Sequence, residues 1–432
     1  MRIGQIGIRC ALAFVTGAAC NVSAQPEWAL TNVQVISPCE SRSWGPATLL
    51  IRGTAIVAID STQEVTIPTS TQRHDMSGGY VIPGLVDAHF HTFQGDASPA
   101  ALDEMRANLE RLLRTGITSI RDMAGDARVL RRLAEEERSG AALPRVFYAA
   151  LLAGPPFTDA RAAAASQGVP LGEAPWMRVV LDTTDPTTVM RDAKLIGATG
   201  IKLYADLSAA TVTRLAAEAK RQGLRVWSHA RVRPLPARQV AVTGVETMSH
   251  AHHFFDELEE TEVVRLRNTA APGGAVRLMS PQLRGVFEAM STRRVMLDPT
   301  LSLYEQDRSG RLMAAGAIVR AARDAGVRIL AGTDPILGSG GNQSDSASAN
   351  RESSVHRELE LLVEYGDLTP MEALRAATCD AAEAVGMTET LGQLSVGRLA
   401  DLVVLGSDPL QDISNVRDTR LVVKNGRIVM GR

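Results

Sequence analysis

The chain has 432 residues, 45% of them apolar, and a formal net charge of −2. This length can hold a barrel of about 250 residues together with a smaller second domain. The near-balanced charge lacks the basic footprint of nucleic-acid-binding proteins, which excludes nucleic acid as an expected partner. After the N-terminus no stretch is long and apolar enough to cross a bilayer, so we expect no transmembrane segment in the mature chain.

The N-terminus predicts a signal peptide over residues 1–24. Two arginines come before an apolar run at 10–19, and small residues occupy 22–24, which is the order of a secretory signal. We expect cleavage near Ala24 and a secreted or periplasmic protein, with an uncleaved N-terminal helix as the alternative. Lipid anchoring at Cys20 is disfavoured, because the usual leucine three residues earlier is missing.

Both ends of the mature chain are typical of short strands. Strand-like apolar runs lie at 31–36, 47–51, 55–58, 401–405, 421–426 and 427–430. Asn425-Gly426 is a strong hairpin signal. We predict that residues 25–80 and 386–432 fold together into one small β-sandwich domain. Cys39 and Cys379 remain after cleavage and are expected to be structural; export permits a disulfide, but the sequence cannot place them within bridging distance.

Residues 81–385 alternate between strands and helices. The first strand, Val81 to His91, begins with an apolar run that is typical of a parallel strand buried on both faces. Eight such strands follow one another, separated by segments with apolar residues at helical spacing. The pattern predicts a closed (β/α)8 TIM barrel. An open doubly wound sheet is disfavoured, because no strand is followed by a Gly-rich phosphate-binding turn.

Potential metal ligands lie at or near the ends of five of these strands. They are His89 and His91 in the first strand, Lys202 in the fourth, His229 in the fifth, His250 in the sixth and Asp334 in the eighth. Residues two apart on a strand point to the same side, so the first two imidazoles leave the strand together. Alone, a buried lysine is more often an ion-pair partner, and an aspartate after Gly-Thr is more often a helix cap. Together the six residues map to the C-terminal face, where barrel active sites are built.

The motifs around these residues resemble those of the metal-dependent amidohydrolase superfamily. They are His89-Phe-His91, Gly200-Ile-Lys202-Leu, Ser228-His229-Ala, Ser249-His250-Ala and Gly332-Thr-Asp334. The likeness covers nearly all of the mature chain. The tail segments at 356–360 and 369–378 are similar to the imidazolonepropionase-like branch, which includes Xaa-Pro dipeptidases.

The resemblance implies a binuclear zinc site, with other divalent metals as alternatives. His89, His91 and Asp334 would hold one ion, and His229 and His250 the other. Imidazole and carboxylate suit zinc, whereas an ammonium has no lone pair to offer. Burial disfavours the charged lysine, so we predict that Lys202 is carboxylated on its amine and bridges the two ions. If Lys202 is an ordinary amine instead, the site is mononuclear.

The expected chemistry is hydrolysis of a C–N amide bond. A hydroxide shared by the two ions would be the nucleophile, and Asp334 would serve as general base and then acid. The expected substrate is a dipeptide of the Xaa-Pro type or an N-acyl amino acid with a free carboxylate. Hydrolysis of a cyclic amide and deamination of a heterocycle are alternatives, although deaminase relatives usually lack the lysine. A non-catalytic metal-binding protein is the third interpretation, and a homo-oligomer is compatible with the sequence.

The sequence also offers candidate substrate-binding residues. Tyr204 lies two residues after Lys202 and could bind a substrate carboxylate or pack under a loop. Arg121, at the end of the second strand, could form a bidentate pair with a carboxylate or pair with Asp122 or another acid. His252 and its neighbour His253 are further candidates for lining the pocket. We expect the long loops at 153–178 and 335–352 to cover the barrel mouth.

Overall fold

The computed structural model describes residues 27–92, 99–157, 165–166, 168–268, 280–335 and 354–431. The predicted signal peptide and Cys20 lie outside the described residues. Of the two loops that were expected to cover the barrel mouth, residues 158–164 and 167 of the first and 336–352 of the second lie outside them as well.

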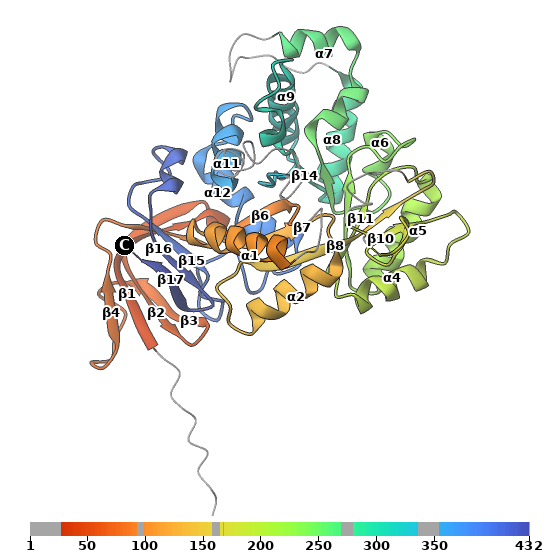
Figure 1. Cartoon of the computed structure of the whole chain (residues 1–432). Coiled ribbons are helices and arrows are strands. Elements are labelled where there is room, and N and C mark those ends of the chain that lie inside the picture. Colours follow the sequence, from red (N-terminus) through yellow and green to blue (C-terminus); the bar gives the residue numbers. More distant parts are fainter. Residues whose placement is uncertain are drawn as a thin grey trace, which may run out of the picture.

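A small sheet combines both ends of the chain. Its strands are β1 (Glu27–Ser37), β2 (Arg42–Arg52), β3 (Ala55–Ser61), β4 (Gln72–Asp75), β5 (Tyr80–Pro83), β15 (Leu402–Leu405), β16 (Thr419–Lys424) and β17 (Arg427–Gly431). They follow the order β17-β16-β15-β5-β1-β2-β3, with β4 also paired to β1. Figure 1 shows the red and orange strands of the chain start beside the blue strands of its end. Alternate residues such as Leu30, Leu49 and Leu402 are buried and form a separate apolar core.

A second, parallel sheet forms the barrel. Its main strands are β6 (Leu85–Phe90), β7 (Ile117–Asp122), β8 (Arg145–Ala153), β11 (Gly200–Leu203), β12 (Arg225–His229), β13 (Thr247–Ser249) and β14 (Met296–Asp298). Each pairs in parallel with the next along the chain. Two short strands, β9 (Glu173–Ala174) and β10 (Met177–Val179), extend this sheet beside the end of β8.

The segment 327–334 closes the barrel as its eighth strand. The backbone N–H of Leu330 donates to the carbonyl of Leu297 in β14 at 2.8 Å, and the N–H of Ala88 in β6 donates to the carbonyl of Ala331 at 2.9 Å. Because this segment bonds to both the first and the seventh strand, the ends of all eight meet around one axis. The predicted fold class, a TIM barrel with a small β domain from both termini, is confirmed.

The helices surround the barrel. They are α1 (Pro99–Arg114), α2 (Ala127–Arg138), α4 (Pro186–Leu195), α5 (Ala209–Arg221), α6 (Ala237–Val240), α7 (Glu260–Arg267), α8 (Pro281–Arg293), α9 (Arg311–Asp324), α11 (Val355–Glu364), α12 (Pro370–Ala376) and α13 (Cys379–Ala384). Several begin at a side-chain cap; for example, Asp126 and Ser208 accept backbone N–H bonds at the starts of α2 and α5. Within the described part of the chain, no helix has the length and hydropathy needed to span a membrane.

The strand expected from Val81 to His91 is divided in two, which corrects the sequence interpretation. Residues up to Pro83 form β5, which pairs with β1 and β15 in the small sheet. The barrel strand begins only after Gly84. A Cβ atom at Gly84 would lie 2.3 Å from Oγ1 of Thr118, so glycine lets the chain pass close to β7 as it changes sheets. The apolar run therefore serves two cores rather than one.

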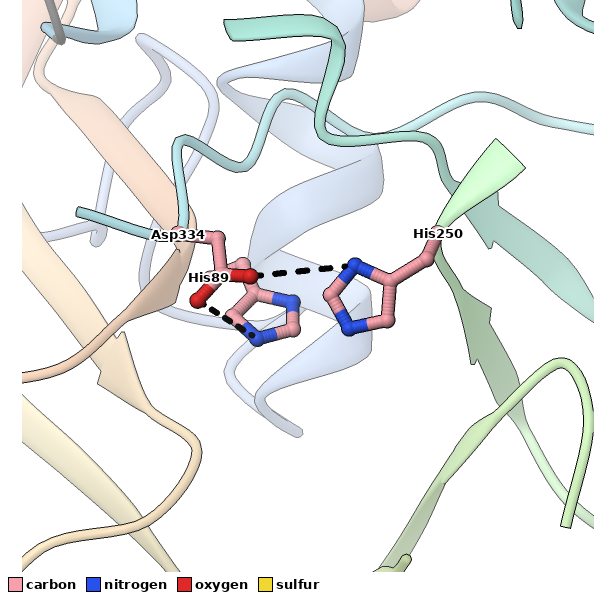
Figure 2. Close-up of side chains that lie close together, drawn as sticks. All are labelled: His89, His250 and Asp334. Atoms are coloured by element: carbon pink, nitrogen blue, oxygen red, sulfur yellow. Dashed lines mark ion pairs between the residues drawn. The ribbon is translucent and has the colours of Figure 1, made fainter. Parts of the chain in front are cut away.

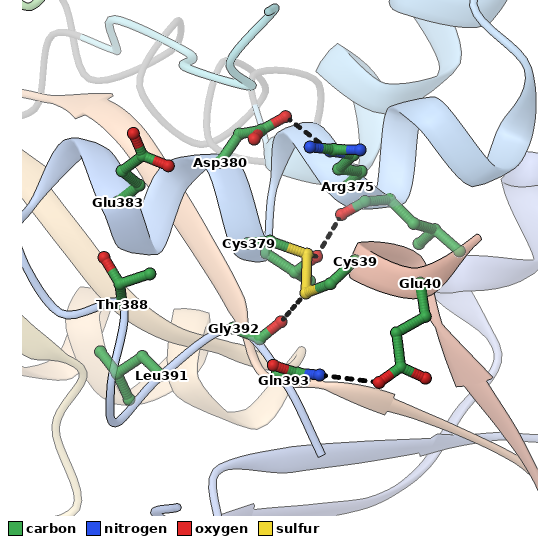
Figure 3. The surroundings of a disulfide bond; sticks show 12 residues. Cys39, Glu40, Arg375, Cys379, Asp380, Glu383, Thr388, Leu391, Gly392 and Gln393 are labelled. Carbon is green, nitrogen blue, oxygen red and sulfur yellow. Dashed lines mark hydrogen bonds and ion pairs between the residues drawn. A yellow bond between two sulfur atoms is a disulfide. The ribbon is translucent and has the colours of Figure 1, made fainter. Parts of the chain in front are cut away.

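A disulfide joins the two units. Cys39, in the short helix η1 (Pro38–Glu40) of the small sheet, is bonded to Cys379 at the start of α13, at a sequence separation of 340. Figure 3 shows this bond where α13 meets the small sheet. Such a long closed loop restricts the unfolded chain strongly.

Replacing both cysteines by serine should lower the free energy of unfolding by about 2–5 kcal/mol, because the unfolded chain regains the entropy of the open loop. Thermal and denaturant unfolding of the double variant against the oxidised wild type measures this. The reduced wild type is the matched control and should behave like the double variant. Equal stability of oxidised and reduced protein would contradict a stabilising role.

Candidate metal centre

The ends of the first and eighth strands are held together by buried polar contacts. Asp87 accepts the backbone N–H of His89 at 3.0 Å and both the N–H and the hydroxyl of Thr333, at 3.1 and 2.6 Å. The backbone N–H of Asp334 donates to the carbonyl of His89 at 2.7 Å. A side chain at Gly332 would collide with His89 and Asp298, so glycine permits this close approach. These contacts fix Asp334 opposite the histidines of the first strand.

Asp334 lies between histidines from two different strands. Its carboxylate is 3.6 Å from Nε2 of His89, 2.8 Å from Nε2 of His91 and 3.8 Å from Nδ1 of His250. One ligand atom each from His89, His250 and Asp334 lie within 4.8 Å of one another (Figure 2). Among the described residues, this group could hold a metal ion.

Backbone strain marks the two residues that face each other in Figure 2. Asp334 has a φ of 50° and His250 a φ of 75°, in the left-handed region that residues with a side chain rarely adopt. Such strained positions cluster at functional sites. Nδ1 of His250 lies 2.9 Å from the hydroxyl oxygen of Thr300, which itself donates to the carbonyl of Pro299. Nδ1 is therefore the donor, and Nε2 of His250 is left as the ligand atom.

The protonation states of the group suit a cation. Burial lowers the pKa of His89, His229 and His250 well below the usual value, so these imidazoles are neutral. Burial alone would raise the pKa of Asp334, but the nearby His89 and His91 outweigh it and the pKa lies below its usual value. Burial would also lower the pKa of His91, but the charge of Asp334 outweighs it and this pKa lies above its usual value. The site thus offers three neutral imidazoles and an ionised carboxylate that pairs with His91.

Lys202 is buried beneath the histidines. Its side chain is 1% exposed, and Nζ donates to the hydroxyl of Ser249 at 2.9 Å. Burial lowers the pKa of Lys202 to about 7, assisted by the charge of Arg121 and opposed by those of Asp298 and Asp334. A substantial fraction of the side chain is therefore a neutral amine at neutral pH.

Asp298, at the end of β14, is a site residue that sequence reasoning missed. Its Oδ2 lies 2.7 Å from Nδ1 of His89 and accepts the hydroxyl of Ser249 at 3.1 Å and a guanidinium N–H of Arg121 at 3.3 Å. By holding Nδ1, it directs Nε2 of His89 towards Asp334. A carboxylate behind a histidine is a common arrangement at metal sites. The signal in the sequence that could have identified Asp298 was an acidic residue at the end of the seventh predicted strand.

Arg121 does not line the cavity, and the prediction that it binds a substrate carboxylate needs correction. Its side chain is fully buried inside the barrel, where it donates to the carbonyl of Ala88, pairs with Asp298 and lies over the ring of Trp227 at 5.0 Å. A charged group at this depth needs an internal partner. The acid that it pairs with is Asp298 and not Asp122.

The predicted ligands line one cavity of about 190 Å³, together with the substrate candidates Tyr204 and His252. The lining also includes the apolar residues Met123, Leu151, Phe157 and Met177. The ring of Tyr204 lies 4.5 Å from that of the predicted ligand His229, and Nδ1 of His252 lies 2.7 Å from the hydroxyl oxygen of Tyr304. Nδ1 of His253 is buried without a hydrogen-bond partner among the described residues.

Residues 80–429 match the amidohydrolase family. The chain belongs to this family. The match covers the barrel and the small-sheet strands from β5 onward, and it confirms the superfamily that the motifs resemble. The protein is therefore a hydrolase of carbon–nitrogen bonds, as predicted.

Relatives and solved structures agree with this placement. Imidazolonepropionase from Deinococcus deserti is 26% identical over 415 residues, which cover 85% of this chain and 87% of the relative. Ochratoxinase from Aspergillus niger is 35% identical over 111 residues, 25% of this chain and only 20% of the relative. A putative prolidase from Bifidobacterium longum superposes with a TM-score of 0.68 at 23% identity, over 94% of this chain and 95% of the other. The A. niger ochratoxinase structure has a TM-score of 0.72 at 21% identity, over 95% and 97%.

The residues present fit the metal that this family uses. His89 is oriented by Asp298, burial keeps His89, His229 and His250 neutral, and Asp334 is ionised. Neutral imidazoles with an ionised carboxylate are zinc ligands in proteins.

Replacing Asp298 by Asn should weaken zinc binding by about 10–100-fold, because the residue that orients His89 loses its charge. Chelator competition on the purified protein measures this affinity. Asp380→Asn is the matched control, since Asp380 is also a buried, arginine-paired acid but lies away from the cavity; it should leave zinc affinity unchanged. Unchanged zinc affinity in the Asp298 variant would contradict the orienting role.

Proposed function

We propose that the protein is a secreted binuclear zinc amidohydrolase that cleaves the amide bond of a dipeptide or an N-acyl amino acid. The observation that carries the proposal is the convergence of His89, His250 and Asp334 above a buried lysine, in one cavity of a barrel of this family. Two bound zinc ions would polarise the amide carbonyl and lower the pKa of the attacking water.

In this proposal Lys202 is carboxylated on Nζ and bridges the two ions. The amine is buried, and among the described residues it forms no ion pair within hydrogen-bonding distance and donates to the hydroxyl of Ser249. A neutral amine can add carbon dioxide, whereas an ammonium cannot. The resulting carbamate has two oxygens, one for each ion, and turns a residue that would repel cations into an anionic ligand.

Asp334 is the residue that moves the proton. Its carboxylate reaches the histidines of the first strand with one oxygen and His250 with the other. From this central place it can take a proton from the attacking water and pass it to the leaving nitrogen. The short contact to His91 keeps the carboxylate ionised before the reaction and fixes its direction.

The cavity supports a substrate with one apolar and one polar end. The apolar lining of Met123, Leu151, Phe157 and Met177 suits an apolar acyl group or side chain. In the same cavity, His253 carries a buried nitrogen without a partner among the described residues, and leaving such a group unpaired costs about 1–3 kcal/mol. A substrate carboxylate held by His253 and the neighbouring hydroxyl of Tyr204 would remove this cost.

The disulfide supports the proposed export. Disulfides persist mainly in oxidising compartments, and the bond between Cys39 and Cys379 joins the two units of the described chain. A mature N-terminus at Gln25 in the periplasmic or culture fraction, read by mass spectrometry, would agree with cleavage near Ala24. An intact N-terminus in the cytosolic fraction would contradict it.

An assay of the zinc-loaded protein against dipeptides, including Xaa-Pro, and N-acyl amino acids tests the function. We expect hydrolysis of members with an apolar acyl group and a free carboxylate, and weaker hydrolysis of their C-terminal carboxamides. His253→Ala should raise KM for the acids by about tenfold and leave the carboxamides nearly unchanged, since only the acids need this contact. Hydrolysis of cyclic amides alone would favour the alternative function, and hydrolysis of no amide would overturn the proposal.

Lys202→Ala should lower bound zinc from two equivalents to one or fewer per chain, because the bridge between the ions is lost. Elemental analysis after dialysis against zinc-free buffer measures the ratio. Lys194→Ala is the control, since this lysine is exposed on α4 and donates only to the carbonyl of Gln222. Two retained equivalents in the Lys202 variant would contradict the bridging role.

A further inference from the structure

A second cavity lies on the face of the barrel opposite the histidines. Its volume is about 480 Å³, and its lining includes Val295, just before the seventh strand, and Arg328, at the start of the eighth. The cavity is therefore at the amino ends of the strands. The disulfide forms part of its wall, together with α13 and the segment that follows (Figure 3). The function proposed above makes no use of it.

The cavity is lined by more positive than negative side chains. Its charged residues are the arginines Arg294, Arg328, Arg375 and Arg398 and the acids Asp380 and Glu383. Each acid is shared: Glu383 accepts two bonds from Arg328 at 2.6 and 2.8 Å, and Asp380 accepts from Arg375 at 3.1 Å and from Arg328 at 3.3 Å. Arg294 also lies 3.6 Å from Glu383. Four arginines against two acids give the described lining a net charge of +2.

In two of these arginines, only some of the guanidinium N–H groups donate hydrogen bonds to described residues. Arg375 donates to Asp380 through Nε alone, and its side chain is 40% exposed. Arg398 donates through Nη1 to the carbonyls of Thr388 and Leu391, which are uncharged acceptors. Both guanidinium groups therefore keep N–H donors for a ligand. Figure 3 shows Arg375 on one side of the disulfide, and Thr388 with Leu391, to which Arg398 donates, on the other.

We propose that this cavity is a binding site for a small ligand that carries a doubly charged oxyanion group, such as a phosphate ester. A dianion matches the net charge of +2 of the lining, and arginine forks bind planar or tetrahedral oxyanions through paired N–H donors. The volume leaves room for an organic part beyond the anionic group, next to Leu391 and Val295.

A ligand here would join three parts of the chain. It would contact the base of the eighth strand through Arg328, α12 through Arg375 and the segment leading to the small sheet through Arg398. A ligand that binds only the folded state stabilises a protein. The anion should therefore stabilise the same junction as the disulfide, without contacting the histidine site.

Inorganic phosphate is the probe for the anionic group. Isothermal titration of the zinc-loaded wild type at constant ionic strength should show saturable binding with one phosphate per chain, and the melting temperature should rise with phosphate but not with chloride. Arg375→Gln and Arg398→Gln should each weaken binding by about tenfold or more, because each removes a charged donor pair. Arg398→Lys should retain part of the affinity, since it keeps the charge.

Arg131→Gln is the matched control, because Arg131 is an exposed arginine on α2 that pairs only with Glu135; its phosphate affinity should equal that of the wild type. Circular dichroism shows whether each variant is folded, and the two arginines provide independent tests. Absence of saturable phosphate binding to the wild type would overturn the proposal. Binding that both arginine variants retain unchanged would place phosphate elsewhere, at the histidine site, and would overturn it as well.

Discussion

The active face of this protein depends on the burial of one amine. Lys202 stands in the fourth strand with almost no access to solvent and with a single hydrogen bond, to Ser249. Burial disfavours its ammonium form, and the neutral form is the one that can become a carbamate. His89, His229 and His250 are neutral for the same reason. One physical cause, the exclusion of water from the barrel interior, thus prepares both the lysine and the imidazoles for binding cations.

Below this layer, a second set of polar residues keeps the first in place. Asp298 holds the back of His89 and is itself held by Arg121 and Ser249. The charges of Arg121 and Asp298 offset each other at a depth where neither would be stable alone. The result is a rigid polar layer beneath a cavity that is also lined by apolar residues. Rigid support of this kind is what a site needs to hold its ligands in a fixed geometry.

Much of this could be predicted from the sequence. The alternation of strands and helices predicts the barrel, and the positions of His89, Lys202 and Asp334 at strand ends predict that they share one face. The sequence could not show whether a strand-end side chain points to the cavity or to the barrel floor. Arg121 and Asp298 both lie at the ends of strands. Only the depth of such a side chain in the barrel decides whether it contacts substrate or forms a buried ion pair. The sequence also could not show that the first strand is divided at Gly84, because the core of the small sheet and the core of the barrel accept the same apolar residues.

X-ray diffraction at the zinc absorption edge, from crystals grown with zinc and bicarbonate, tests the central claim most directly. The account predicts two anomalous peaks about 3.5–4 Å apart, as in other two-metal sites, joined by density that extends beyond Nζ of Lys202. A single peak, or none, together with a plain amine at the end of that side chain, would contradict it.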